Sequence, residues 1–447
     1  MRKWIWIIPV LLFFIFLPQI ASISLLRVIF NRAFSAKVHA TTDIQSVHLS
    51  WMGPQKFQKI TLSSPNMSGY IEEFQSSAPF WKLNDLGTDF HIVDGSVTFP
   101  AEGNIGLNHI TAEVHNNHLS AQGDALPKGH FTLTGKIFSP SDVDISYELQ
   151  EVPTQALDQI LNGKRILSQI LGPMLNANGS WVFNQTKGQL KLDLQSTYAA
   201  TNLIAHLDSE FLTLEQPLVA ELEITPELAA TLLRNANPLF LTGIESKKAI
   251  ELRIEPEGFR YPWRNFDVSK IEVQEGSLDL GQVECQIGKS LSTLISLFKN
   301  FQRSNSTLIW FSPIEFSLKN GLLQTKRMDA LISNSIHICT WGKIDLARDK
   351  LDMILGLCAD TLSRSFGIAN LPANYVLKIP LQGSTENPEL DTKTAAAKIA
   401  TLTAMNQLPQ VGGKAGKMFG GTLNMMKMSM ENQDDVPPPQ RPYPWEK

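Results

Sequence analysis

The chain has 447 residues, of which 43% are hydrophobic and 18% charged. This composition excludes an intrinsically disordered protein and leaves room for two or three ordinary domains or one extended repetitive domain. The net charge of -4 provides no basic field, so no nucleic-acid partner is predicted. The three cysteines, Cys285, Cys339 and Cys358, form no CxxC pair, which excludes a disulfide-built scaffold and favours buried thiols.

The N-terminus is the strongest local signal. An uncharged run from Trp4 to Leu26 follows Arg2 and Lys3 and is long enough to cross a bilayer. A removable signal peptide with a cleavage site near Ala21 remains an alternative, and flanking charge does not settle the orientation. We predict that residues 1–36 are a membrane anchor, and its expected lipid-facing residues are Trp4, Trp6, Leu11, Phe14, Leu17, Leu25 and Leu26.

Apolar and polar residues alternate repeatedly along residues 37–305, which predicts a strand-rich body. Ala40 to Thr61 reads as a strand pair around a turn at Gly53-Pro54. Each predicted strand has one polar and one apolar face, so the strands together would form a continuous apolar surface. The residues expected on this surface, as candidates for a lipid groove, are Leu190, Leu192, Leu194, Leu222, Ile224, Leu252, Ile254, Ile314, Phe316 and Leu318.

Only three helices are predicted in the body, at residues 154–171, 226–236 and 290–301. They are too few to cover the whole apolar surface, which a soluble monomer would not leave exposed. A second sheet, the helices or bound lipid are the available covers. The helices are expected to complete the core at the ends or bends of the sheet. That they gate a ligand channel is a sharper hypothesis.

Residues 306–391 are predicted to form a C-terminal β unit, with turns at Asn320-Gly321 and Arg348-Asp349. Leu351 to Cys358 alternates strictly and adds three groove candidates, Met353, Leu355 and Leu357. A polar residue followed by glycine and an alternating run recurs in the chain, which indicates a weak strand-turn-strand repeat. The recurrences are Asp94-Gly95, Asn178-Gly179, Lys187-Gly188 and Glu275-Gly276.

The C-terminal region changes character. Residues 392–430 are basic and Met-rich and begin with an Ala-rich helix from Thr394 to Met405. Two interpretations stay open for this segment: it binds an anionic bilayer or an envelope partner protein, or it packs on the sheet and ends in a loose tail. Residues 431–447 are Pro-rich and acidic, and they are predicted to be a disordered tail.

The sequence shows no constellation that predicts a catalytic, cofactor or metal site. Gly288-Lys289-Ser290 resembles the end of a phosphate-binding loop, but Val283 stands where that loop needs glycine. His115 and His118 have no further Cys or His ligand nearby. A non-enzymatic protein without a cofactor is therefore expected.

Several stretches together resemble the AsmA-like proteins of bacteria with two membranes. They are the N-terminal anchor, SVHLSWMGPQ and FQKITLSS near the start, and the step ITPELAATLL. Residues 320–362 and LPANYVLKIPLQGSTENPELD add most, including the pattern Pro380-x-x-Gly383-x-x-x-x-Pro388. The resemblance covers the C-terminal third best and the anchor loosely.

The resemblance implies a protein anchored in the inner membrane, with its body in the periplasm. It implies a mostly β fold: an elongated, repetitive antiparallel sheet that forms a groove or sandwich, with a few short helices and an N-terminal transmembrane helix. The implied function is binding and transfer of phospholipid between membranes in support of the outer membrane, with membrane lipids as partners. One alternative is a scaffold or assembly factor for outer-membrane proteins with a closed apolar core. Another is an enzyme acting on envelope polymers.

Overall fold

The chain is described here by a computed structural model. It describes residues 30–32, 35, 40–64, 67–99, 106–139, 141–160, 166–225, 229, 242–246, 248–264, 267–286, 292, 295–296, 298, 306–369, 371–407 and 436–446. The predicted span from Trp4 to Leu26 lies outside these residues, as do nearly all of the predicted helices at 226–236 and 290–301 and the Met-rich stretch 408–430. Within the described part of the chain, no helix is both long and apolar enough to cross a membrane.

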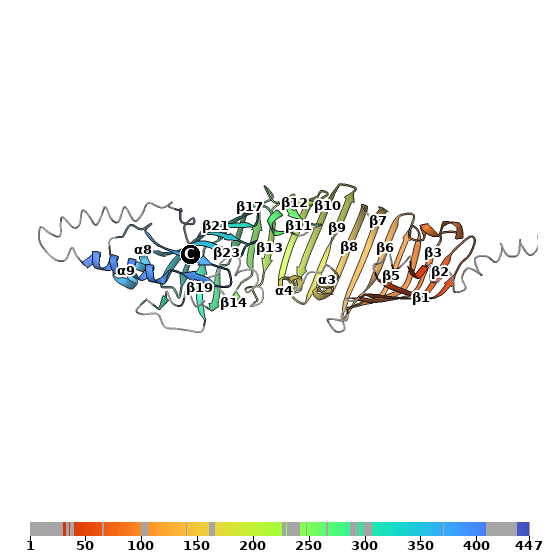
Figure 1. The fold of residues 1–447 in the computed structure, drawn as a ribbon, viewed down its shortest axis with the longest axis horizontal. Coiled ribbons are helices and arrows are strands. Elements are labelled where there is room, and N and C mark those ends of the chain that lie inside the picture. Colours follow the sequence, from red (N-terminus) through yellow and green to blue (C-terminus); the bar gives the residue numbers. More distant parts are fainter. Residues whose placement is uncertain are drawn as a thin grey trace, which may run out of the picture. The chain divides into compact units, whose positions relative to one another are not determined.

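The described residues form a mostly antiparallel β protein with a few short helices, as the alternation predicts. The chain divides into two compact units, Met1–Ser209 and Glu210–Lys447 (Figure 1). The sequence instead suggested a boundary at residues 305/306. Strands on the two sides of that point pair with each other, β17 (Val273–Asp279) with β20 (Ile314–Lys319), so the second unit begins earlier.

The first unit is a meander in which each strand pairs antiparallel with the next, from β1 to β11. Short connections between consecutive strands make this order the simplest one. The strands are β1 (Thr41–His48), β2 (Gln55–Ser64), β3 (Met67–Ser76), β4 (Phe90–Thr98), β5 (Gly106–His115), β6 (His118–Ala125), β7 (Gly129–Ser139), β8 (Asp142–Pro153), β9 (Met174–Asn184), β10 (Lys187–Ser196) and β11 (Ala199–Leu207).

The geometry of the turns explains how some neighbouring strands of the first unit pair. His115 and His118 flank a two-residue turn in which Asn116 and Asn117 have φ of 50° and 64°, as a type I′ hairpin requires. The strand pair predicted around Gly53-Pro54 is confirmed as β1 and β2. The predicted strand-turn-strand repeat is wrong for most of its glycines, which do not lie at turns. Gly95, Gly179 and Gly276 lie inside strands, and only Lys187-Gly188 opens one.

The second unit contains a branched sheet. One branch runs through β13, β15, β17 and β20, the other through β14, β18 and β19, and both pair with the same edge of β21. From β21 the sheet continues through β22, β23, β24 and β25. The strands are β12 (Phe211–Leu214), β13 (Leu218–Leu222), β14 (Thr242–Ser246), β15 (Ile250–Ile254), β16 (Tyr261–Pro262), β17, β18 (Gln282–Gln286), β19 (Thr307–Phe311), β20, β21 (Leu322–Ile332), β22 (Ile336–Asp345), β23 (Lys350–Cys358), β24 (Val376–Gly383) and β25 (Pro388–Leu390).

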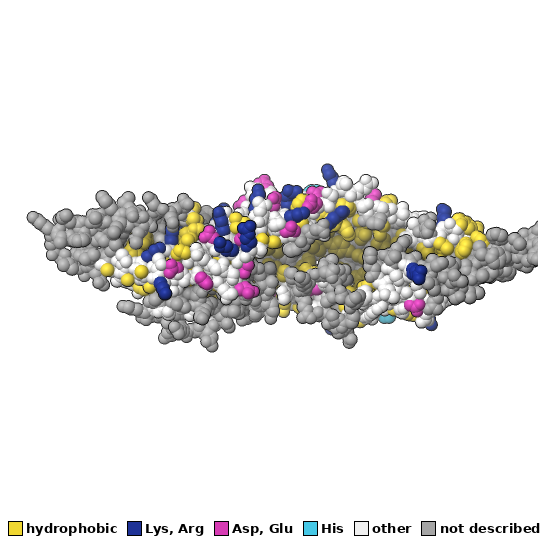
Figure 2. All heavy atoms as spheres, in the orientation of Figure 1, with side chains coloured by type: hydrophobic (Ala, Val, Ile, Leu, Met, Phe, Trp, Pro, Cys, Tyr) yellow, Lys and Arg dark blue, Asp and Glu magenta, His cyan; other side chains and the backbone are white. Residues whose placement is uncertain are grey.

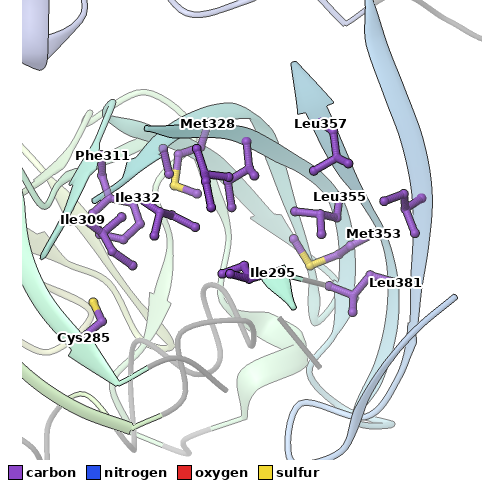
Figure 3. Close-up of a cluster of buried hydrophobic side chains, with 14 of the residues drawn as sticks. Cys285, Ile295, Ile309, Phe311, Met328, Ile332, Met353, Leu355, Leu357 and Leu381 are labelled. Atoms are coloured by element: carbon purple, nitrogen blue, oxygen red, sulfur yellow. The ribbon is translucent and has the colours of Figure 1, made fainter. Parts of the chain in front are cut away.

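The branching encloses a large apolar core. Side chains from both branches and from β21 to β24 converge on it (Figure 3). Ile309, Ile332 and Leu355 are each 0% exposed. Burying such a side chain contributes roughly 1.5–3 kcal/mol, so this closed core dominates the stability of the second unit.

Short helices flank the sheets. The predicted helix at 154–171 is described as two pieces, α3 (Thr154–Ile160) and α4 (Ile166–Leu171), and buried Asp158 accepts hydrogen bonds from the first amides of α4. In the second unit α8 (Ala359–Phe366) ends at Gly367, whose φ of 66° lies in the left-handed region that glycine adopts most readily. The predicted Ala-rich helix is confirmed as α9 (Thr392–Gln407), which packs on β24 through the core.

Candidate functional site

One face of the first unit is apolar across all of its strands. The strand registers place one residue of each strand in a single cross-strand row, and none of these residues is charged. The opposite face carries a matching polar row that includes Thr132, Glu148, Asn178 and Asp193. We call the first surface the apolar face; its central row is Val47, Phe57, Phe74, Ile92, Ala112, Ala121, Leu133, Tyr147, Gly179, Leu192 and Leu203.

The apolar face is covered at one end and open further along. At β1 to β3 it is packed: Phe57 is 0% exposed, with its ring 5.0 Å from that of Phe30. From β7 to β10 its large aliphatic side chains, such as Leu133 and Leu192, are mostly half-buried, and Trp181 is 37% exposed. Figure 2 shows these hydrophobic side chains gathered in a hollow over the strands that Figure 1 labels β7 to β10.

Tyr147 is the one polar side chain of the central row, and its hydroxyl is already engaged. It reaches across β9 and donates to the backbone oxygen of Lys191 on β10 at 3.0 Å. Gly179 makes room for it, because a Cβ there would lie 2.0 Å from that same oxygen. Burial raises the pKa of Tyr147 to about 12, so the group stays neutral. The row therefore offers a ligand apolar surface only.

The predicted groove residues separate into two environments. Leu190, Leu192 and Leu194 lie on the apolar face of the first unit and are half-buried. The others lie in the second unit. Leu222, Leu252, Ile254, Phe316 and Leu318 are half-buried there, whereas Ile224, Ile314, Met353, Leu355 and Leu357 are packed inside the closed core, each at most 4% exposed.

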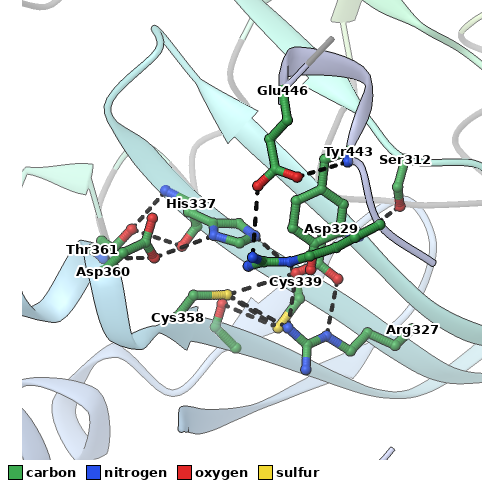
Figure 4. A network of polar contacts seen from close by, with 12 residues as sticks. Ser312, Arg327, Asp329, His337, Cys339, Cys358, Asp360, Thr361, Tyr443 and Glu446 are labelled. Atoms are coloured by element: carbon green, nitrogen blue, oxygen red, sulfur yellow. Dashed lines mark hydrogen bonds and ion pairs between the residues drawn. The ribbon is translucent and has the colours of Figure 1, made fainter. Parts of the chain in front are cut away.

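A second cluster, which the sequence reading did not identify, lies on the outer side of β21 to β23 (Figure 4). Asp329 is 0% exposed and accepts hydrogen bonds from Arg327 Nε at 2.9 Å and Nη2 at 2.8 Å. Its Oδ1 also contacts His337 Nε2 at 2.8 Å, while His337 Nδ1 lies 3.2 Å from Asp360. The thiols of Cys339 and Cys358 lie 3.8 Å apart beside this group. We call these residues the buried polar cluster.

The charges of the buried polar cluster stabilise one another. Burial alone would lower the pKa of His337, but its bonds to Asp329 and Asp360 raise it to about 9, so the imidazole is charged at neutral pH. Burial would raise the pKa of Asp329, yet the hydrogen bonds and charges of His337 and Arg327 hold it below its usual value. The bond to Cys339, together with burial, raises the pKa of Cys358 well above the usual range.

The arrangement does not match a nucleophile-base pair. Both imidazole nitrogens of His337 contact carboxylates, so neither is placed to take a proton from Cys358, and the thiol is itself held protonated. The ligand atoms of Asp329, Cys339 and Cys358 are close enough to hold a metal ion. However, Arg327 Nη2 contacts both Asp329 and Cys358, and its charge would oppose a cation there. The geometry thus fits a structural ion-pair network.

The end of the chain covers this cluster. Residues 436–446 belong to the segment expected to be a disordered tail, but they are placed against the second unit. Tyr443 is 3% exposed and stacks on Trp445 with ring centroids 4.7 Å apart; each ring lies edge-on to His337 at 5.6 Å. The buried Tyr443 ring, stacked on Trp445 and packed against His337, offsets the tendency of a Pro-rich segment to stay solvated.

Replacing Tyr443 with alanine is expected to release residues 436–446 from the cluster. The change removes a buried ring and its stacking on Trp445, at a cost of about 2–3 kcal/mol to docking of the tail. Limited digestion with chymotrypsin should then cleave after Trp445, before Glu446, much faster than in the unchanged chain. The matched control is Gln440→Ala, since Gln440 is exposed; equal cleavage of both variants would contradict the docking.

Comparison with family models, with curated proteins and with solved structures gives no match. The AsmA-like resemblance therefore remains a prediction.

Proposed function

We propose that the chain is a non-enzymatic lipid carrier that holds acyl chains on the apolar face and transfers phospholipid between membranes. The observation that carries the proposal is the uncharged cross-strand row from Val47 to Leu203, half-buried rather than packed from β7 to β10. A face of this kind needs a cover, and within the described residues the central row is packed by protein at β1 to β3 and is mostly half-buried beyond them.

The dimensions suit acyl chains. Beyond the covered strands β1 to β3, the eight strands β4 to β11 spaced by about 4.8 Å give roughly 34 Å along the stacking direction, whereas one leaflet of acyl chains is about 15 Å deep. Several lipids would therefore fit side by side. Each buried methylene contributes roughly 0.8 kcal/mol, so tight binding requires no specific polar contact. Movement along a uniform apolar surface requires no chemistry, and a gradient or a partner supplies direction.

The N-terminal run from Trp4 to Leu26 supports the location in this proposal. In it, residues 1–36 anchor the chain in the inner membrane and the body lies in the periplasm, where it serves outer-membrane biogenesis. The alternative of a non-catalytic assembly factor draws on the second unit, whose apolar core is closed. Half-exposed leucines on the first unit favour the carrier.

Photocrosslinking from the two faces of the same strand tests the proposal. We expect benzophenone-phenylalanine at Leu133, on the apolar face, to form phospholipid adducts in cells, and the same group at Thr132, on the polar face, to form none. Adducts are identified by mass spectrometry of the full-length chain. Protein adducts at Leu133, without lipid, would favour the assembly factor instead.

A charged substitution on the apolar face is expected to weaken phospholipid binding. Leu192→Asp should lower the phospholipid that co-purifies with the full-length chain severalfold, since a carboxylate beside acyl chains has no partner. Gln195→Asp adds the same charge to the same strand on the polar face, where the side chain is exposed, and should change nothing. Equal lipid content in the two variants would contradict binding at this face.

A further inference from the structure

The second unit contains a pocket of about 590 Å³, at a site separate from the apolar face. It lies between β22, β24, α9 and the C-terminal tail, and Val436, Pro437 and Pro438 form one wall. Such a volume is in the range of small-molecule sites. The pocket also adjoins the buried polar cluster, because Arg327 belongs to both.

The described side chains that line the pocket carry positive charge only. Arg327, Lys378 and Lys398 contribute three cationic groups, and no lining residue is a carboxylate. Arg327 is held by Asp329 behind the wall, with its own side chain 8% exposed. The ammonium of Lys398 donates to the backbone oxygen of Lys378 at 3.0 Å, which fixes it beside β24. Arg327 and Lys398 are thus held in place, although Asp329 neutralises Arg327, and Lys378 adds a further cationic residue to the lining. The two lysines therefore supply the charge that an anion would need, and the position of Lys398 is already fixed.

The remaining walls are apolar. The lining includes Trp341 and Tyr375, together with the prolines of the tail. A bare inorganic ion would leave these walls without contact, whereas a ligand with a carbon skeleton would use them.

We infer that this pocket binds a phosphate-bearing ligand. The phosphate oxygens accept hydrogen bonds from Lys378 and Lys398, with Arg327 at the rear. Where the phosphate carries an organic group, that group packs on Trp341 and Tyr375. Phosphate is the shared chemistry, and its source is either a phospholipid head group or free phosphate. The inference is independent of the proposed carrier function, because a head-group fragment has no acyl chain.

Calorimetric titration of the full-length chain in nonionic detergent tests this site. The probes are glycerol phosphate, inorganic phosphate and glycerol. Glycerol phosphate binding at least tenfold more tightly than phosphate supports a lipid head group as the source. Equal binding of these two supports free phosphate. Absence of heat up to millimolar concentrations of both overturns the site, as does equal binding of glycerol.

Matched lysine variants assign the binding to the pocket. Lys398→Gln and Lys378→Gln should each lower affinity about tenfold or more, as expected for loss of a charge-assisted hydrogen bond. Lys393→Gln removes the same charge from the same helix, at an exposed position outside the pocket, and should leave affinity unchanged. Circular dichroism checks that each variant is folded. Loss of affinity in all three variants alike, or in none, overturns the assignment.

Discussion

Replacing Asp329 with alanine is expected to destabilise the second unit by about 3–5 kcal/mol. Asp329 is 0% exposed and neutralises two buried cations, Arg327 and His337. Its loss leaves both of them without their common partner in a site that water does not reach, and breaking a buried ion pair from one side costs about that much. Hydrogen exchange of peptides from β21 to β23 would report the loss as earlier opening.

Two further variants make this result specific. Asp352→Ala removes an exposed carboxylate from β23 and should change stability by less than about 0.5 kcal/mol. A combined Arg327→Met, Asp329→Leu and His337→Leu variant removes all three charges, and it should recover much of the stability, since apolar replacement of a whole buried network is often tolerated. A single alanine variant as stable as the unchanged chain would show that the cluster is solvated.

The same alternation of polar and apolar residues gives different structures in the two units. In the first, consecutive hairpins extend one sheet and leave an apolar face half-buried from β7 to β10. In the second, β19 and β20 both pair with β21, and the two branches close on each other around the core. A closed core has no room for cargo, so the proposed lipid handling is assigned to the first unit. The second unit is better suited to a discrete ligand or a contact.

Local alternation was sufficient to predict the strands that carry most of the groove candidates. Leu190, Leu192 and Leu194 share a face because side chains in a strand have a period of two, whatever the strand pairs with. The same rule placed Leu355 correctly on one face of β23. It could not tell that Leu355 would be 0% exposed and Leu192 half-buried. That difference arises from the branch at β21, a long-range pairing that leaves no local pattern.

The buried polar cluster was beyond sequence reasoning for a similar reason. Asp329 and His337 lie on neighbouring strands, Asp360 begins a helix, and Tyr443 comes from the far end of the chain. Nothing short-range joins them. One signal was present, since Tyr443 and Trp445 are large aromatic residues in a segment otherwise typical of a solvated tail. Aromatic residues in a Pro-rich tail are candidates for docking.

The stability of the second unit should fall by about 3 kcal/mol between pH 6.5 and pH 9. The pKa of His337 is about 9 in the folded chain against 6.5 for an ordinary histidine. Below pH 6.5 both states hold the proton and the stabilisation is complete; it is lost as pH rises through the folded pKa. Asp329 and Asp360, whose pKa values are lowered, act in the opposite sense and lose their contribution only in acid.

Stability of the unit should therefore be greatest between about pH 4 and pH 6.5. The measurement is hydrogen exchange of β21 to β23 from pH 4 to pH 9, corrected for the intrinsic exchange rate. His337→Gln should remove most of the slope between pH 6.5 and pH 8, because the imidazole no longer holds a proton that the unfolded chain has lost. Cys358, whose pKa is also raised, adds to the slope only near the ordinary pKa of a thiol and above it. His118→Gln, at an exposed hairpin of the first unit, should leave the slope intact. If the slope persists in His337→Gln, another group causes it and the imidazole is neutral in the folded chain.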